Sequence, residues 1–321
     1  SFEVDPGSSL LLHSIGSRID VGSLGTVLDV GSGVGTLALA LAAKNPRLRA
    51  TCVDRDALAL AFTERNALAN GIQGVECAAS LGVEAVQGRT FDLVMSNIPA
   101  KAGNPVIEEM LSGFAACAGE AGTVAVVIVR TLSDFAREAL VRGGAEILHE
   151  NVTKEYTVYH YRGTRAPSKA ASLDVYVRGA FPFSRAGKSW SIRAVYGVPE
   201  FDSLDHATEL ALDLLAETDA RPIPPGEALV INPGQGHVPV FLSLASRDVA
   251  VAGRDFLALR ASEAAVRGAT GRSVALRHVP WLGRVPGTFA LVCVNYAKEA
   301  VPRAHELLAR DLAGLVAPGG T

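Results

Sequence analysis

The chain has 321 residues, 49% of them hydrophobic, which is enough to fill the cores of two ordinary domains. Its formal net charge of −3 gives no whole-chain basis for binding nucleic acid. The apolar runs are no longer than strands, the four cysteines form no C-x-x-C pair and the chain does not begin with Met. We therefore expect a cytoplasmic protein, trimmed at both ends, without signal peptide, membrane span, disulfide or metal.

Strand and helix patterns alternate through the first part of the chain. Strands are predicted at 26–32, 49–55, 74–80, 91–97 and 122–130, helices at 35–45, 57–71, 105–119 and 132–144, and two closing strands within 146–163. This alternation predicts a mostly parallel sheet with helices on both faces. The first domain is accordingly assigned to residues 1–163.

The same order recurs in residues 199–321, which are assigned to a second domain. VLDVGSGVG is matched by ALVINPGQG, CVDRDALAL by AGRDFLAL, and FDLVMSN by FALVCVN, all at a nearly constant offset. Several matches in one order indicate an internal duplication. The predicted fold is α/β, with two tandem Rossmann-like domains that each contain a mostly parallel seven-stranded sheet.

Residues 164–198 form a predicted connector between the copies, and their composition is distinct. Counted from Tyr161 to Val198, one acid, Asp174, stands among interleaved aromatic residues and many cations: Arg162, Arg165, Lys169, Arg178, Arg185, Lys188 and Arg193. Residues 173–179 and 188–197 are predicted to pair as a hairpin across 180–187. Two interpretations stay open. The connector is solvated and its aromatics pack on one domain, or it binds single-stranded nucleic acid through Arg185, Lys188 and Trp190.

The glycine turn in the first copy predicts a ligand site. Gly31, Gly33 and Gly35 let the chain turn from strand to helix and let a ligand approach the backbone near a helix N-terminus, which favours an anion. Asp29 lies in the strand before the turn, where a carboxylate can meet a cationic group. Asp54 ends the next strand, where it can accept both ribose hydroxyl groups.

Two further residues refine this prediction. Thr36 stands where a dinucleotide-binding turn takes glycine or alanine, so it argues against a nicotinamide-dependent oxidoreductase. Asp54 could instead cap the following helix, but Asp56 can fill that role and leave Asp54 for a ligand.

Three segments in order, VLDVGSGVG, CVDRD and SNIPAKAG, resemble class I S-adenosylmethionine-dependent methyltransferases. The likeness is greatest to the small-domain branch, in which Asn-Pro-Pro-aromatic ends the fourth strand. The duplication is similar to that of ribosomal RNA guanine-N2 methyltransferases, which hold one active and one degenerate copy, although their active copy comes second. The resemblance implies S-adenosylmethionine as cofactor and covers residues 1–163 better than 199–321.

The resemblance also implies roles for matching residues. Asn97 and the Ile98 carbonyl would accept hydrogen bonds from a substrate amine, and Pro99 would fix their turn. The glycines would border the methionine part of the cofactor, Asp29 its ammonium group, Asp54 its ribose, and Ser80 and Leu81 its adenine. The residues implied to bind the cofactor are Asp5, Ser8, Asp29, Gly31, Gly33, Gly35, Asp54, Arg55, Ser80, Leu81 and Asn97.

The motif after the fourth strand departs from the family at two positions. Ile98 replaces a proline, and Ala100 replaces the aromatic residue that stacks on a flat substrate. The base that would be methylated is therefore left open, and Lys101 would contact a phosphate or carboxylate of the substrate.

The second copy lacks the acids of the first, because Val230 stands for Asp29 and Gly253 for Asp54. We predict that only the first copy binds cofactor and that His237 is structural. The predicted function is N-methylation of an RNA base, with the second domain supporting the first or binding substrate. A protein or small-molecule methyltransferase and a non-catalytic cofactor-binding scaffold are the alternatives.

Overall fold

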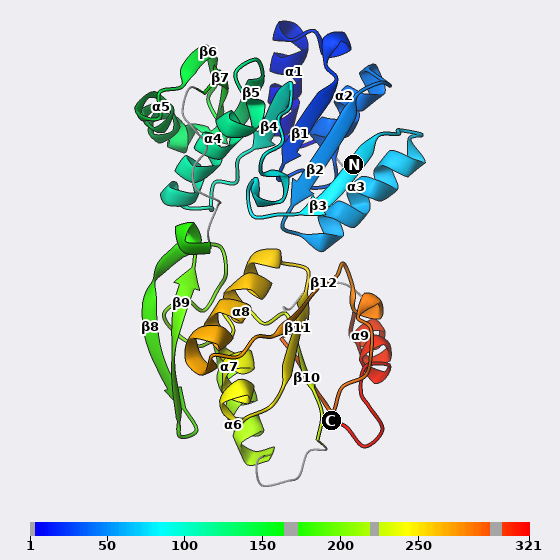
Figure 1. Cartoon of the computed structure of the whole chain (residues 1–321), viewed down its shortest axis with the longest axis vertical. Helices are drawn as coiled ribbons and strands as arrows, with labels where there is room; N and C mark the ends of the chain where they lie inside the picture. The colour runs from blue at the N-terminus through cyan, green and yellow to red at the C-terminus, as the bar shows by residue number, and fades with distance from the viewer. Residues whose placement is uncertain (1–3, 164–172, 219–224, 296–303) are drawn as a thin grey trace. The chain divides into compact units, whose positions relative to one another are not determined.

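The computed structural model describes residues 4–163, 173–218, 225–295 and 304–321, and the chain divides into two units, residues 1–176 and 177–321 (Figure 1). The boundary lies within the predicted connector, so the part of the connector from Val177 onward belongs to the second unit. Residues 164–172 of that connector, with Arg165 and Lys169, lie outside the described residues.

The first unit contains the predicted seven-stranded sheet, in the order β3-β2-β1-β4-β5-β7-β6 (Figure 1). Five strands are parallel: β1 Thr26–Val30, β2 Arg49–Asp54, β3 Val75–Ala79, β4 Leu93–Asn97 and β5 Thr123–Val129. The last two, β6 Glu146–Val152 and β7 Tyr156–Arg162, are antiparallel to their neighbours. The strand order reverses at β1, so ligands are expected beyond the carboxyl ends of β1 and β4.

Helices cover both faces of this sheet. The helices of the unit are α1 Pro6–Arg18, α2 Thr36–Lys44, α3 Ala57–Ala69, α4 Asn104–Ala118 and α5 Ser133–Arg142, with short 3-10 turns η1 Val21–Ser23, η2 Glu84–Val86, η3 Arg130–Leu132 and η4 Leu173–Tyr176. In β1, Val27 packs with α1 and α2, whereas the next residue, Leu28, packs with α4 and α5. Successive side chains of a strand point to opposite faces, so both must be apolar here.

The second unit contains a parallel sheet in the order β12-β11-β10-β13 (Figure 1). These strands are β10 Ala228–Ile231, β11 Val249–Gly253, β12 Ala275–His278 and β13 Leu291–Val294, and the helices are α6 His206–Thr218, α7 His237–Leu244, α8 Phe256–Thr270 and α9 Ala304–Ala313, with η5 Leu282–Arg284. This order repeats β3-β2-β1-β4, as the duplication predicts. The described residues give it four strands rather than the seven predicted. After α9 the chain makes an isolated parallel bridge between Val316 and Phe289, which precedes β13.

The predicted hairpin is present, as β8 Val177–Arg185 and β9 Lys188–Val195. It turns at Ala186 and Gly187, which both have positive φ, 47° and 74°. A two-residue turn of this kind matches the twist of the strands it joins. The prediction of a longer turn over 180–187 is therefore wrong, because residues 180–185 continue the strand.

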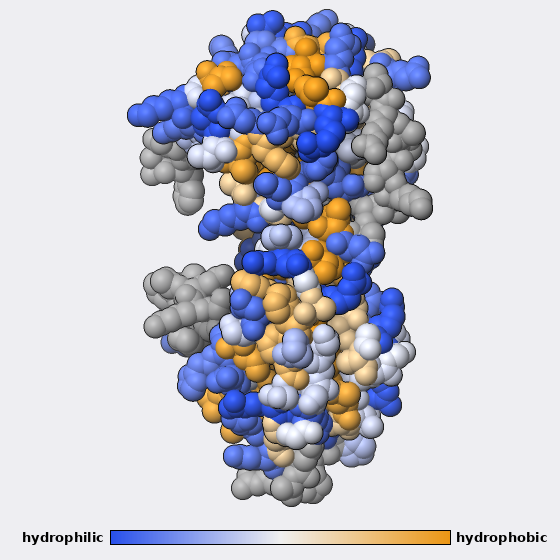
Figure 2. Space-filling model, turned by 90° about the vertical axis from the view of Figure 1, so that its left-hand side faces the viewer, coloured by the Kyte–Doolittle hydropathy of each residue, from blue (hydrophilic) through white to orange (hydrophobic). Residues whose placement is uncertain are grey.

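None of the described helices is long and apolar enough to cross a membrane. On the face drawn in Figure 2, apolar side chains lie in separate patches among hydrophilic ones. The four cysteines are free thiols.

Candidate functional site

The turn between β1 and α2 contains three glycines with left-handed backbone, with φ of 71° at Gly31, 57° at Gly33 and 86° at Gly35. A Cβ atom on Gly31 or Gly33 would meet nothing within 4 Å, so the backbone is open to an approaching group. A Cβ atom on Gly35 would lie 2.9 Å from Cγ2 of Thr63. Two glycines therefore give access to the turn, and the third allows α2 to pack closely on α3.

Asp54 holds this turn from the end of β2. Its Oδ2 accepts a hydrogen bond from the Gly33 N–H at 2.8 Å, and its Oδ1 accepts one from the Asp56 N–H at 2.9 Å. Asp56 caps α3 by accepting from the Leu58 N–H at 2.8 Å, as predicted. A carboxylate oxygen can accept more than one hydrogen bond, so Asp54 can still bind a hydroxyl group of a ligand. Its neighbour Arg55 is half-buried.

Asp29 is a fully buried carboxyl group beneath the same turn. Its Oδ2 accepts from the Ala38 N–H at 3.1 Å, which caps α2 because the N-cap residue Gly35 has no side chain. No group of the described residues bonds to its buried Oδ1. Burial raises the pKa of Asp29 to about 7. A cationic group at this position would supply the missing partner and favour the ionised form.

Asn97, at the end of β4, is held by the start of α1. Its Nδ2 donates to Asp5 Oδ2 at 2.8 Å and to Ser8 Oγ at 3.1 Å. Asp5 Oδ2 also accepts from the Ser8 N–H at 2.8 Å, as the N-cap of α1. These contacts fix which end of the Asn97 amide faces α1, and no described residue donates to Asn97 Oδ1. The sequence predicts that Asp5 and Ser8 contact a cofactor. In the structure, both side chains hold the Asn97 amide in place.

Tyr156 belongs to this cluster and was missed by the sequence analysis. A Cβ atom on Gly7 would lie 3.0 Å from Tyr156 Cε1, 3.1 Å from Asp5 Oδ2 and 3.3 Å from Asn97 Nδ2. Gly7 therefore lets α1 approach the side chains of Tyr156 and Asn97. Tyr156 starts β7 opposite Val129, the last residue of β5, so its ring lies at the carboxyl edge of the sheet. No local sequence pattern signals this contact.

The segment after β4 is an exposed turn that follows the buried residue Ile98. The Ile98 side chain is buried, and its N–H donates to the Val127 carbonyl at 2.9 Å. The Pro99 carbonyl accepts from the Ala102 N–H at 3.1 Å, and Pro99, Ala100 and Lys101 are exposed. The structure thus brings Asn97 and this turn to the edge where Asp29, Asp54 and the glycines lie.

Ser80 and Leu81 stabilise the turn after β3. Ser80 Oγ donates to the Gly82 carbonyl at 2.9 Å and accepts from the Ala85 N–H at 3.1 Å, and the Leu81 side chain is buried. The Ser80 hydroxyl and the Leu81 side chain are thus used within the turn. Any contact of this segment with an adenine would be left to its backbone.

The three connector residues predicted to contact substrate are engaged within the second unit. Arg185 Nη2 lies 2.7 Å from Asp213 Oδ2, and Lys188 Nζ lies 4.9 Å from the centre of the Phe241 ring. Trp190 is only 6% exposed and packs in the core of that unit. The interpretation that Trp190 binds single-stranded nucleic acid is therefore wrong. Its side chain packs on one domain, as the alternative interpretation expects, because the hairpin packs its inner face against α7 and α8.

The second copy keeps the turn without its acids. Asn232, in the place of Gly31, has a φ of 53°, and Gly234 and Gly236 keep 57° and 98°. Asparagine is among the few residues that tolerate this conformation. Val230 and Gly253 are buried where the first copy has Asp29 and Asp54.

His237 is buried, as expected of a structural residue. It accepts a hydrogen bond at Nδ1 from Trp190 Nε1 at 3.2 Å, and its Nε2 lies 3.2 Å from the Glu200 carbonyl. The histidine therefore joins the hairpin to the rest of its unit. Within the described ranges no group of three or more His, Cys, Asp or Glu side chains could hold a metal ion.

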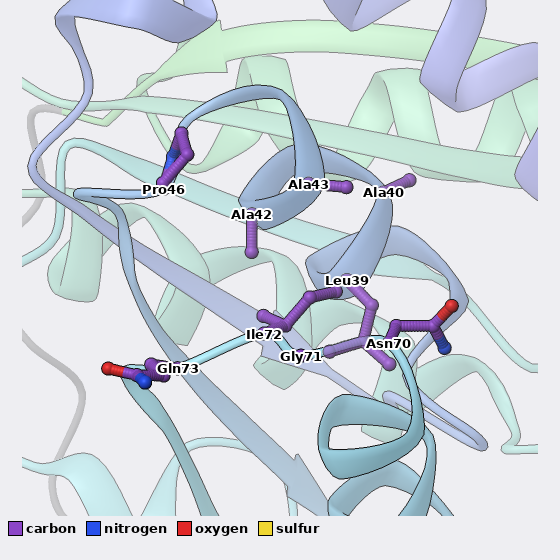
Figure 3. A pocket seen from close by; sticks show the side chains of 9 residues that line it. All are labelled: Leu39, Ala40, Ala42, Ala43, Pro46, Asn70, Gly71, Ile72 and Gln73. Carbon is purple, nitrogen blue, oxygen red and sulfur yellow. The ribbon is translucent and has the colours of Figure 1, made fainter.

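A hollow of about 630 Å³ lies between α2 and the turn after α3, away from these residues (Figure 3). Leu39 and Ala43 of α2 line it together with Ile72 and Gln73, which precede β3. It therefore opens toward the amino edge of the sheet, opposite the glycine turn, and contains none of the predicted site residues.

Residues 1–160 match the family model of the methyltransferase small domain. Ribosomal RNA small subunit methyltransferase C of Serratia proteamaculans is 33% identical over 171 residues, which are 52% of this chain and 47% of that protein. The same enzyme of Aeromonas hydrophila is 41% identical over 101 residues, 32% of this chain and 28% of that protein. The chain thus matches less than half the length of these curated relatives.

Among solved structures, the T. thermophilus 16S rRNA N2 G1207 methyltransferase, in complex with AdoMet and guanosine, has a similar fold. The match has a TM-score of 0.70 and covers 98% of this chain and 82% of that one, at 17% identity. The likeness supports the α/β architecture of both units.

Proposed function

Through residues 1–160 this chain belongs to the methyltransferase small domain family, and we propose on that basis that it is an S-adenosylmethionine-dependent methyltransferase acting on a nitrogen of an RNA base. The observation that carries the proposal is the orientation of Asn97. Its Nδ2 is held by Asp5 and Ser8, which leaves Oδ1 as an acceptor for a substrate N–H at the carboxyl edge of the sheet.

The described residues fit the cofactor. The unpartnered Asp29 Oδ1 suits an ammonium group, the open backbone at Gly31 and Gly33 suits close approach, and the Asp54 carboxylate suits ribose hydroxyls. S-adenosylmethionine supplies a methyl group already activated by its sulfonium. The protein therefore mainly has to align the nucleophile. Asn97 Oδ1 and the Ile98 carbonyl would accept the two amine hydrogens and turn the nitrogen lone pair toward the methyl group.

RNA is the favoured substrate because the curated relatives are ribosomal RNA methyltransferases. The test is transfer of label from methyl-labelled S-adenosylmethionine to total RNA, protein and metabolite fractions by the full chain. Label in RNA at a base nitrogen is expected. Label in protein or metabolites alone would overturn the RNA substrate, and no label in any fraction would favour a non-catalytic scaffold.

Affinity for S-adenosylmethionine should rise between pH 6 and 7. Burial raises the pKa of Asp29 from 3.8 to about 7, and only the ionised carboxylate attracts the ammonium group. The ionised fraction of Asp29 grows about fivefold over this interval, so Kd measured by calorimetry should fall about fivefold.

Without cofactor, the folded chain keeps a proton on Asp29 that the unfolded chain releases, so Asp29 makes the fold less stable as pH rises from about 4 to 7. An Asp29→Asn variant with the same pH dependence would contradict the assignment.

Asp5→Ser should separate positioning of Asn97 from capping of α1. A serine can still cap the helix at the Ser8 N–H, but it removes the carboxylate that holds Asn97 Nδ2. Turnover should fall about tenfold, with little change in melting temperature or cofactor affinity. Asp205→Ser is the matched control, because Asp205 caps α6 of the second copy at the Thr208 N–H. Equal turnover in both variants would refute the positioning role.

A further inference from the structure

The second unit carries an exposed tryptophan at the corner that corresponds to the nucleoside corner of the first. In the first unit, this corner combines the β2–α3 turn with Asp54 and the turn after β3 with Ser80. In the second unit, β11 and β12 are parallel neighbours with Gly253 opposite His278, so their following turns leave the same edge of the sheet. The turn after β12 contains Trp281, whose exposed fraction is 46%.

Trp281 and Arg284 form a local pair on this turn. The Arg284 Cζ atom lies 5.3 Å from the centre of the Trp281 ring, and the Arg284 N–H donates to the Trp281 carbonyl at 3.1 Å. Arg284 is exposed and pairs with no acid in the described part of the chain.

The charge of this corner differs between the copies. Asp54, which would repel a phosphate, is replaced by Gly253, and the turn after β12 adds the Arg284 cation. In the basic hairpin, Arg185 is paired with Asp213, Trp190 is buried, and the Arg178 Cζ atom lies 3.6 Å from the centre of the Phe201 ring. A half-exposed indole beside a guanidinium that has no acidic partner among the described residues matches what single-stranded RNA presents, a flat base next to a phosphate.

We propose that Trp281 and Arg284 form a contact site for single-stranded RNA on the second unit, with a base on the indole and a phosphate on the guanidinium. The proposal deepens the proposed function and rests on RNA as its substrate. The site would hold substrate RNA and would perform no chemistry.

The test is binding of a dye-labelled single-stranded RNA 12-mer to the full chain without cofactor, followed by fluorescence anisotropy. Trp281→Ala should weaken binding about 5- to 150-fold, as loss of one stacked base does, and Trp281→Phe should restore most of the loss. Arg284→Ala should reduce the slope of log affinity against log salt by about one. Arg267→Ala is the charge-matched control, because Arg267 is an exposed arginine of α8 that pairs with Glu263, and it should leave affinity unchanged.

Intrinsic fluorescence gives a second readout, since the chain has two tryptophans and Trp190 is buried. RNA should quench part of this emission in the wild type and none in Trp281→Ala. Wild-type affinity in both Trp281→Ala and Arg284→Ala would overturn the proposal, even if the RNA is methylated. Absence of RNA methylation with binding that depends on Trp281 would instead overturn the proposed substrate and leave this site standing.

Discussion

Replacing Asn97 by alanine should lower methyl transfer by about 100-fold or more, because the substrate amine loses the acceptor that aligns its nitrogen. Affinity for S-adenosylmethionine should stay close to wild type, since Asn97 contacts Asp5 and Ser8 and neither the glycine turn nor Asp54. Single-turnover transfer of labelled methyl to RNA, with calorimetry for cofactor affinity, measures both quantities.

The matched control is Asn295→Ala in the second copy. Asn295 follows β13 as Asn97 ends β4, and its N–H donates to the Ile231 carbonyl at 3.0 Å, a bond that the substitution keeps. This variant should transfer methyl at the wild-type rate. Lost cofactor affinity with retained turnover in Asn97→Ala would show that Asn97 serves the cofactor instead of the substrate.

Replacing Asp54 by alanine should weaken S-adenosylmethionine binding by about one to two powers of ten. The variant loses the carboxylate that would accept the ribose hydroxyls and that holds the Gly33 and Asp56 N–H groups. Calorimetry should give one cofactor per wild-type chain, because Val230 and Gly253 leave the second copy without either acid. Two cofactors per chain would refute the prediction that only the first copy binds cofactor.

A cofactor analogue separates the two roles of Asp54. Wild type should bind S-adenosylhomocysteine more tightly than an analogue without ribose hydroxyl groups. If Asp54 binds the ribose, Asp54→Ala should lose that preference. A preference that persists in the variant would mean that Asp54 acts only by shaping the turn.

The succession of strands and helices along the first unit and the glycine turn could be predicted because their signals are local. The central strands contain buried apolar runs, such as Leu93–Met95 of β4 and Val124–Ile128 of β5. The spacing of Gly31, Gly33 and Gly35 indicates a backbone conformation that few residues adopt. The cap at Asp56 is equally local, since it acts two residues along the chain.

The contacts between distant side chains could not be predicted. Asn97 and Asp5 are 92 residues apart, and only folding brings α1 to the end of β4. Arg185 looked like a free cation in its own segment because its partner Asp213 is on α6. A local excess of charge therefore does not tell which cations remain unpaired. In the same way, the sequence around Trp190 does not tell that its side chain is buried in the second unit.

The turn of the second copy has a consequence for its history. A Cβ atom on Gly253 would lie 3.2 Å from the Asn232 Oδ1 atom. An acid could therefore return at position 253 only if Asn232 gave way, and Asn232→Gly alone restores no ligand group while it loses the Asn232 hydrogen bond to the Asn295 carbonyl. Because the two positions are in contact, we expect substitutions at 232 and 253 to have non-additive effects on the free energy of unfolding, measured in a double-mutant cycle.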